Sequence, residues 1–195
     1  MIVSIIGPSG CGKGTQAKLL AEKLGLPAIS GGEVLRREYE IGTPEGIEAE
    51  KYWGEGKWPP ADLIMEVLKK RLDQPDCQNG FVLDGAPREI NQIPLLEDYF
   101  VQKGQKLDLV LHLDTSDETS LSRIQSRIFR TKEAGEKVRE DEDFEEVKER
   151  LRQYHQTVEP VLKYFEEKGI LRRINNEESI EQVFEEIAAA VEELS

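Results

Sequence analysis

Cysteine, long apolar runs and positive charge are all scarce in this sequence. Its 195 residues include two cysteines, Cys11 and Cys77, and these form no CxxC pair. Two thiols are too few for a disulfide framework, and without a paired CxxC they indicate a reducing compartment and no metal site. No apolar run approaches the roughly 20 residues of a membrane-spanning helix. The start, Met1-Ile2-Val3, leads into a predicted strand without a signal-peptide pattern, so we expect a cytoplasmic protein with no membrane partner.

The charge balance is acidic, with 26 lysines and arginines against 39 aspartates and glutamates and a net charge of −13. This balance argues against a nucleic-acid partner, which would need a basic face. It does not exclude small phosphorylated substrates, because local clusters of positive charge make those sites. The sequence has no long internal repeat and no low-complexity linker. Its length suits one sizeable α/β core better than two independent domains.

The stretch 7–15, Gly-Pro-Ser-Gly-Cys-Gly-Lys-Gly-Thr, is the most informative part of the sequence. It follows an apolar, β-branched run at 2–6 that predicts a buried strand, and it precedes residues 16–24, whose apolar positions recur at helical spacing. Glycines let the backbone curl with its N–H groups pointing inward, and the helix N-terminus and Lys13 add positive charge. The loop therefore predicts a cradle for polyphosphate. In the strict P-loop pattern a serine or threonine follows the lysine directly, whereas here Gly14 stands there and Thr15 comes one place later.

Strands alternate with helices along the rest of the chain. The pattern predicts further strands at 26–30, 81–83, 107–113 and 170–174, and helices that include residues 61–72, 118–127, 144–165 and 180–191. Such an alternation indicates a parallel sheet with right-handed crossovers, in which the chemistry lies at the carboxyl ends of the strands. Gly10, Ser30 and Asp84 all fall at those ends, so we expect three separate segments to meet at one cleft.

Local patterns also predict where helices begin and break. Residues 30–33, Ser-Gly-Gly-Glu, have the pattern of a capping box that opens a helix. More helix is expected within 43–59, which ends in a Gly-Lys-Trp-Pro-Pro break. Pro160 falls inside the helical pattern at 144–165 and predicts a kink or a restart there.

Four arginines in the second half of the chain form an informative set. Arg123 and Arg127 are four residues apart and so share a helix face. Arg139 follows a loop of small and charged residues, and Arg150 lies on the next predicted helix. Taken singly, each would be read as an ordinary surface arginine. Their value lies in the pattern that they form together.

Four stretches carry a resemblance to a known family. Residues 7–16, 30–36, 84–88 and 150–154 are similar, in order and spacing, to the nucleoside monophosphate kinases, and most of all to adenylate kinase. The resemblance covers essentially the whole chain and accounts for Thr15, because the family has Gly-Lys-Gly-Thr in its loop. It implies a P-loop kinase fold of the α/β class, with a five-stranded parallel sheet flanked by helices. It also implies a core of residues 1–29, 60–126 and 140–195, an insertion that binds the nucleoside monophosphate (NMP) at 30–59, and a short lid at 127–139.

The reaction that the resemblance implies is reversible transfer of the γ-phosphoryl group of MgATP to AMP, giving two ADP; a UMP/CMP-type or broad-specificity kinase is the alternative. The acceptor phosphate is already an anionic nucleophile, so the site needs positioning and positive charge rather than a general base. The residues that match the family's catalytic pattern are Lys13, Arg88, Arg127, Arg139 and Arg150. Those that match its ATP site are Gly10, Cys11, Gly12, Lys13, Gly14, Thr15, Arg123 and Arg127. Those that match its NMP site are Gly31, Arg36, Lys57, Trp58, Pro59, Gly85, Ala86, Pro87, Arg88, Gln92, Arg139 and Arg150.

The resemblance also implies the cofactor and the partners. Asp84 resembles the acidic residue that holds magnesium through water, and Arg123 the residue that packs on the donor adenine. The short lid lacks the cysteines of zinc-binding lids, so we expect Mg²⁺ with ATP and no zinc. The expected partners are ATP and AMP, and the expected state is a monomer. The mechanism asks nothing of His112 and His155, which we expect to be structural or exposed.

Two positions depart from the family's pattern. Gly31 stands where adenylate kinases usually have threonine, and Ala86 stands where the family usually has phenylalanine. The first departure loosens the expectation of strict AMP specificity, and the second predicts a wider acceptor pocket. Gln92 corresponds to the glutamine that reads adenine, and its planar amide can both donate to and accept from the edge of the base. We therefore expect a preference for AMP with tolerance of other monophosphates.

Two other classes of function are open at this point. A different small-molecule kinase on the same scaffold would leave Arg36, Gln92 and the 84–88 motif unexplained. A non-catalytic nucleotide-binding module would be expected to lose Lys13 or the lid arginines, which this sequence retains. A GTPase is disfavoured because the sequence has no Asn-Lys-x-Asp motif.

Overall fold

A parallel sheet forms the centre of the part of the chain that the computed structural model describes, namely residues 1–53, 57–135 and 143–194. Its five strands are β1 (Ile2–Ile6), β2 (Ala28–Ser30), β3 (Phe81–Asp84), β4 (Leu109–Asp114) and β5 (Leu171–Asn175). The order across the sheet is β2-β3-β1-β4-β5, and every pairing is parallel. The predicted α/β class and five-stranded parallel sheet are confirmed.

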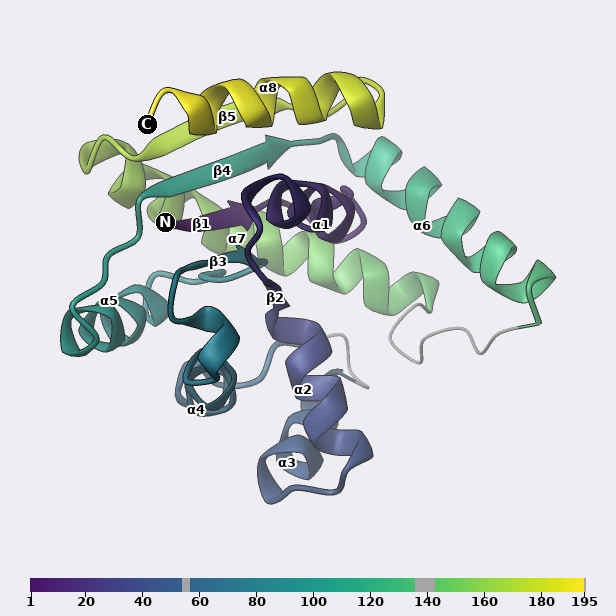
Figure 1. The fold of residues 1–195 in the computed structure, drawn as a ribbon. Coiled ribbons are helices and arrows are strands. Elements are labelled where there is room, and N and C mark those ends of the chain that lie inside the picture. The colour runs from purple at the N-terminus through teal and green to yellow at the C-terminus, as the bar shows by residue number, and fades with distance from the viewer. Residues whose placement is uncertain (54–56, 136–142, 195) are drawn as a thin grey trace.

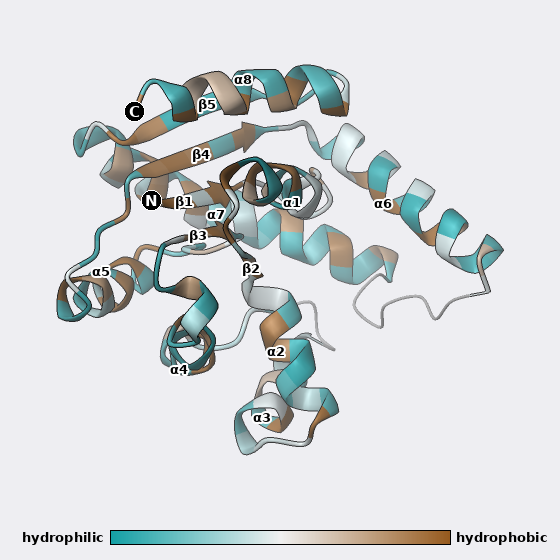
Figure 2. Cartoon of the chain, in the orientation of Figure 1, coloured by the Kyte–Doolittle hydropathy of each residue, from teal (hydrophilic) through white to brown (hydrophobic). Residues whose placement is uncertain are grey.

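Helices connect the strands and cover both faces of the sheet (Figure 1). They are α1 (Lys13–Leu24), α2 (Gly31–Glu40), α3 (Pro44–Trp53), α4 (Ala61–Leu72), α5 (Gln92–Gln102), α6 (Asp117–Glu133), α7 (Phe144–Glu167) and α8 (Ile180–Glu192), with a 3-10 turn η1 (Pro75–Cys77). Figure 2 shows the strands as largely hydrophobic and the helices as mixed, as expected for a sheet that is covered on both sides. No helix in the described ranges has the length and apolar character of a membrane span.

The alternation of side chains along the strands divides the core into two layers. Val3 and Ile5 of β1 are fully buried in a cluster with residues of α1 and α8. Ile2 packs in a cluster with α4 and α5, and Ile6 in a cluster with α7. Successive side chains of a strand point to opposite faces, so α1 and α8 cover one face and α4, α5 and α7 cover the other.

α2 and α3 stand away from the sheet and pack on each other (Figure 1). Gly46 allows this close approach, because a Cβ at that position would lie 2.2 Å from the backbone nitrogen of Tyr39. Ala49 of α3 and Val67 of α4 belong to the small apolar cluster that attaches this pair to the core. The pair falls within the predicted NMP-binding insertion at 30–59. The boundaries of that insertion, of the core and of the lid stay predictions.

One local prediction is wrong, and so is one alternative of a second. Ser30 is the N-cap residue of α2, but its side chain makes no capping hydrogen bond. Ser30 and Glu33 instead line the cavity described below. α7 runs through Pro160 without a break, so of the two predicted effects, a kink or a restart, the restart does not occur. Val161 and Phe165 are buried beyond the proline, and this burial offsets the one backbone hydrogen bond that proline removes.

The predicted lid at 127–139 begins inside a helix. α6 continues to Glu133, six residues beyond the predicted end of the helix at 127, and ends in a turn at Ala134 and Gly135. Residues 136–139 of the predicted lid lie outside the described residues.

Candidate active site

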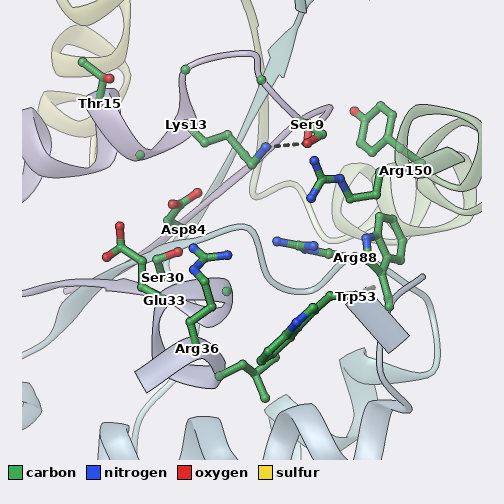
Figure 3. Close-up of a pocket in the computed structure, with 18 of the residues that line it drawn as sticks. Ser9, Lys13, Thr15, Ser30, Glu33, Arg36, Trp53, Asp84, Arg88 and Arg150 are labelled. Atoms are coloured by element: carbon green, nitrogen blue, oxygen red, sulfur yellow. Dashed lines mark hydrogen bonds between the residues drawn. The ribbon is translucent and has the colours of Figure 1, made fainter. Parts of the chain in front are cut away.

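A cavity of about 350 Å³ opens at the carboxyl ends of the strands. Its wall combines the glycine loop after β1, the start of α2 after β2, and Asp84 at the end of β3 (Figure 3). The three segments that were predicted to meet at one cleft therefore do so. Cationic side chains prevail on the wall, where the carboxylates are those of Glu33 and Asp84 and the cations are Lys13, Lys18, Arg36, Lys57, Arg88, Arg127 and Arg150.

The loop between β1 and α1 needs glycine for both conformation and space. Gly10 and Gly12 have φ angles of 85° and 101°, which side-chain-bearing residues rarely adopt. A Cβ at Gly10 would also lie 2.6 Å from the Ile124 side chain of α6. α1 begins at Lys13 in the cavity wall, so the unpaired N–H groups and partial positive charge of its N-terminus lie at the cavity.

The Lys13 side chain turns back across this loop. Its Nζ donates to the carbonyl oxygens of Gly7 at 2.9 Å and of Pro8 at 2.7 Å. Figure 3 shows the ammonium group on the cavity side of the loop. A phosphate oxygen carries negative charge, so it attracts the ammonium group more strongly than a neutral carbonyl oxygen does. Lys13 is therefore placed to exchange its carbonyl partners for a phosphate.

The back of the loop is fixed by a buried polar network. The carbonyl oxygen of Cys11 accepts from Arg123 Nη1 and from Asn176 Nδ2, both at 2.6 Å. Arg123 Nη2 also donates to the carbonyl of Asn176 at 2.9 Å, and Asn176 Nδ2 donates to Thr115 Oγ1 at 2.7 Å. The network ties the loop to α6 and to the segment that follows β5.

Arginines from separate segments converge on the opposite side of the cavity. Figure 3 shows the guanidinium groups of Arg36, Arg88 and Arg150 pointing into it. Arg88 Nε donates to the carbonyl of Gly85 at 2.7 Å, which fixes the side chain against its own loop. Planar guanidinium groups bind phosphate oxygens through two parallel hydrogen bonds, so this side of the cavity suits phosphate groups.

The oxygen atoms near the loop fit a hard cation. Asp84 Oδ2 lies 3.4 Å from the position that a Cβ on Gly14 would occupy, so its carboxylate faces the first turn of α1. Ser30 and Glu33 line the same side of the cavity in Figure 3. Magnesium prefers oxygen ligands and keeps most of its waters, and this donor set fits a water-mediated magnesium ion. Within the described ranges, no group of three or more His, Cys, Asp or Glu side chains is arranged to hold a metal directly.

A family model described as adenylate kinase matches residues 5–170. The chain belongs to the adenylate kinase family. Curated relatives with the name adenylate kinase include proteins of Archaeoglobus fulgidus, which is 36% identical over all of this chain and 99% of its own, and of Chelativorans sp., which is 37% identical over 96% of both chains. A third, from Agrobacterium fabrum, is 35% identical over the full length of both chains. The chain is therefore a nucleoside monophosphate kinase, an enzyme that transfers phosphoryl groups.

Most residues that match the adenylate kinase pattern lie on the cavity wall. Those that do so are Gly10, Gly12, Lys13, Gly14, Thr15, Arg36, Lys57, Trp58, Pro59, Asp84, Arg88, Arg127 and Arg150. The matching residues that do not line it in this conformation are Cys11, Gly31, Gly85, Ala86, Pro87, Gln92 and Arg123. Arg139 lies outside the described residues.

Two of the residues away from the wall are buried beside it. Ala86 is 3% exposed and packs in the cluster of α4 and α5, so the cavity lining gives no support to the expected widening at this position. Gln92 is 1% exposed, and its Oε1 accepts from the backbone N–H of Arg88 at 2.8 Å. Gln92 therefore shapes the loop that carries Arg88.

Sequence reasoning missed several residues of the site. Lys18, Glu33, Trp53 and Tyr154 are among those that line the cavity, and Asn176 completes the network behind the glycine loop. Asn176 directly follows the last strand, and its place at the carboxyl edge of the sheet could have indicated it. The apolar stripe that contains Tyr154 gave no such signal, because aromatic residues at helical spacing are usually core.

The two histidines are structural or exposed, as expected. His112 is buried on β4, and its Nε2 lies 2.6 Å from the phenol oxygen of Tyr154. Burial lowers the pKa of the His112 imidazole to about 4, so this histidine is neutral at physiological pH. His155 lies on the outer side of α7 and pairs with Asp117 at 2.8 Å.

Proposed function

We propose that this chain catalyses the reversible transfer of the γ-phosphoryl group of MgATP to AMP, giving two ADP. The observation that carries the proposal is a single cavity in which the lysine of the glycine loop meets arginines from α2, the 85–91 loop, α6 and α7. Because the acceptor phosphate is already an anionic nucleophile, the reaction needs positioning and charge rather than a general base. The cationic wall supplies both.

The donor side is formed by the glycine loop. Lys13 leaves the carbonyls of Gly7 and Pro8 and binds the β- and γ-phosphate oxygens of ATP. The N–H groups of the loop and of the first turn of α1 hold the remaining phosphate oxygens. Arg127 and Arg150, from two different helices, neutralise the charge on the group in transfer, and Arg139 belongs to this set by resemblance.

The acceptor side is formed by α2 and the 85–91 loop. Arg36 and Arg88 bind the phosphate of AMP, and Lys57 adds a further positive charge to the wall. Gln92 reads the adenine by resemblance to the family. Its Nε2 is buried and has no hydrogen-bond partner among the described residues, so this donor is unused, and the side chain has to become accessible when AMP binds.

Asp84 is the residue that would hold magnesium through water, with Ser30 and Glu33 on the same side of the cavity. Magnesium bound with ATP would supply positive charge to the phosphate groups during transfer. A monomeric state and a cytoplasmic location remain predictions from the sequence.

The reverse reaction tests this proposal without a second substrate. ADP supplied with Mg²⁺ as the only nucleotide should give ATP and AMP in equal amounts. The Lys13→Ala variant should lose about 10²–10³ in rate, because it removes one charged donor from the transition state. Release of inorganic phosphate without ATP, or no reaction of ADP, would contradict the proposal.

A further inference from the structure

Arg88 has at least four contacts within the described part of the chain. Its backbone N–H donates to Gln92 Oε1 at 2.8 Å, and its carbonyl oxygen accepts from Thr157 Oγ1 at 3.2 Å. Its Nε donates to the Gly85 carbonyl at 2.7 Å. The fourth contact is with an indole ring, since the guanidinium carbon lies 5.3 Å from the ring centroid of Trp58. Three contacts come from the core, and the fourth comes from the segment that precedes α4.

The indole contact acts on the guanidinium group itself. A cation above an aromatic face is attracted by the ring quadrupole, and tryptophan gives the strongest such attraction. The contact is not a hydrogen bond to an acceptor atom. It therefore adds an orienting force on the guanidinium group without replacing the N–H···O contacts through which arginine binds phosphate.

Folding stability does not explain the choice of tryptophan at position 58. The indole Nε1 is buried and has no hydrogen-bond partner among the described residues. A buried donor without a partner costs folding free energy, and phenylalanine would fill most of the same space without that cost. Trp58 also lies on the wall of the phosphate cavity, next to the group that it stacks on.

We propose that Trp58 is a positioning residue that sets the orientation of Arg88 for the acceptor phosphate. The inference deepens the proposed function and rests on it, because it assumes that Arg88 binds the monophosphate. It also means that the 57–60 segment and the 85–91 loop form the acceptor-phosphate site together. The insertion at 30–59 then contributes to the geometry at the acceptor phosphate through Trp58.

Two substitutions of Trp58 distinguish the effect of its aromatic face from the effect of its side-chain volume. Trp58→Leu removes the aromatic face and should lower kcat/KM for AMP about tenfold, with KM for ATP unchanged within about twofold. Trp58→Phe keeps a weaker aromatic face and should lose only about threefold, with a free energy of unfolding equal to or above that of the parent. Phe144→Leu is the matched control. It removes a cation–π contact on the outer surface of α7, where Lys148 Nζ lies 4.2 Å from the centroid of the Phe144 ring, and it should leave kcat/KM unchanged.

A double-mutant cycle with Arg88→Ala distinguishes positioning from direct contact with the nucleotide. Binding of AMP in the absence of ATP, measured by calorimetry, is the readout, because it does not need turnover. Trp58→Leu should weaken AMP binding about tenfold in the parent and less than about twofold in the Arg88→Ala background. An equal loss in both backgrounds would overturn the inference, since Trp58 would then act without Arg88. An unchanged affinity for the folded Trp58→Leu chain in the parent background would also overturn it.

The same measurements separate this inference from the proposed function. A parent chain that binds AMP but transfers no phosphoryl group would refute the function, while the binding cycle would still decide the role of Trp58. A parent chain that neither binds nor phosphorylates a nucleoside monophosphate would overturn both.

Discussion

Arg88 is the single side chain on which acceptor chemistry most depends, because the loop, Gln92 and Trp58 all fix it at the cavity. Loss of one charged donor to a transition state costs about 3–4 kcal/mol, so Arg88→Ala should lower kcat about 10²–10³-fold. Arg152→Ala is the control, since Arg152 lies on the same helix as Arg150 but pairs with Glu149 on the exposed side. Steady-state kinetics with MgATP and AMP give the comparison. A loss under tenfold for Arg88→Ala would contradict its role.

Gly31 offers a residue-scale test of acceptor specificity. A Cβ at this position would meet no described atom within 4 Å, so the first atom of a threonine side chain has room here. Its hydroxyl would add a hydrogen-bonding group where adenylate kinases usually have one. Gly31→Thr should leave the free energy of unfolding unchanged or slightly higher and raise the preference for AMP over CMP about fivefold, the effect of one hydrogen bond. A preference that does not move would show that position 31 does not contact the base.

At the scale of elements, the glycine loop is constrained by α6. Gly10→Ala requires a positive φ and places a Cβ 2.7 Å from the backbone oxygen of Ser120. Gly104→Ala requires a similar φ of 65° but meets nothing within 4 Å. The strain of a left-handed alanine is about 1–2 kcal/mol, so Gly104→Ala should lose about that much and Gly10→Ala at least about 3 kcal/mol. Urea unfolding measures both. Equal losses would mean that the loop shifts freely away from α6.

The elements also show what the sequence could and could not predict. The strand, glycine loop and first helix were predictable, because over residues 2–24 the spacing of the apolar residues and the positions of the glycines and the lysine all indicate the same structure. The predicted capping box at Ser30 does not form, because the side chains of Ser30 and Glu33 face the cavity. A true capping box opens α8, where Ser179 and Gln182 face only solvent and their own helix. The sequence pattern alone does not distinguish the helix start at Ser30 from the one at Ser179, because the two differ in their tertiary surroundings: a cavity in one case and solvent in the other.

Tertiary contacts explain why the roles of Asn176 and Ala86 were not predicted from the sequence. Asn176 reaches Cys11 across 165 positions, and no local pattern reports such a pair. Ala86 was expected to widen the acceptor pocket because it stands where the family usually has phenylalanine, but its side chain packs in the core. The motifs therefore predicted which residues lie near the cavity. The direction in which each side chain points could be seen only in the fold.

For the whole molecule, the buried His112 makes the free energy of unfolding depend on pH. The pKa of His112 is lowered to about 4 from about 6.5, mainly by burial; Arg173 and Lys13 lower it further, and Asp114 opposes them. Between these pH values the unfolded chain binds more protons than the folded chain, so stability falls as the pH falls from about 6.5 to about 4. The contribution, fully present above pH 6.5, is on the order of 3 kcal/mol.

Denaturant unfolding from pH 4.5 to 7.5 checks this prediction. The His112→Gln variant lacks the titrating group, so its free energy of unfolding should fall less steeply over the acid part of the range than that of the parent. Carboxylates titrate in both chains and cancel in the difference between the two slopes. Parallel slopes would contradict a neutral, buried His112.

The claim that this chain phosphorylates AMP is tested by comparing phosphoryl transfer from MgATP to AMP, CMP, UMP and GMP, with Lys13→Ala as the control. We predict the highest kcat/KM for AMP, with measurable transfer to the other monophosphates and a loss of about 10²–10³ in rate in the control. Turnover of CMP or UMP equal to that of AMP would assign the chain to the pyrimidine or broad-specificity kinases. No transfer to any of the four would contradict the claim.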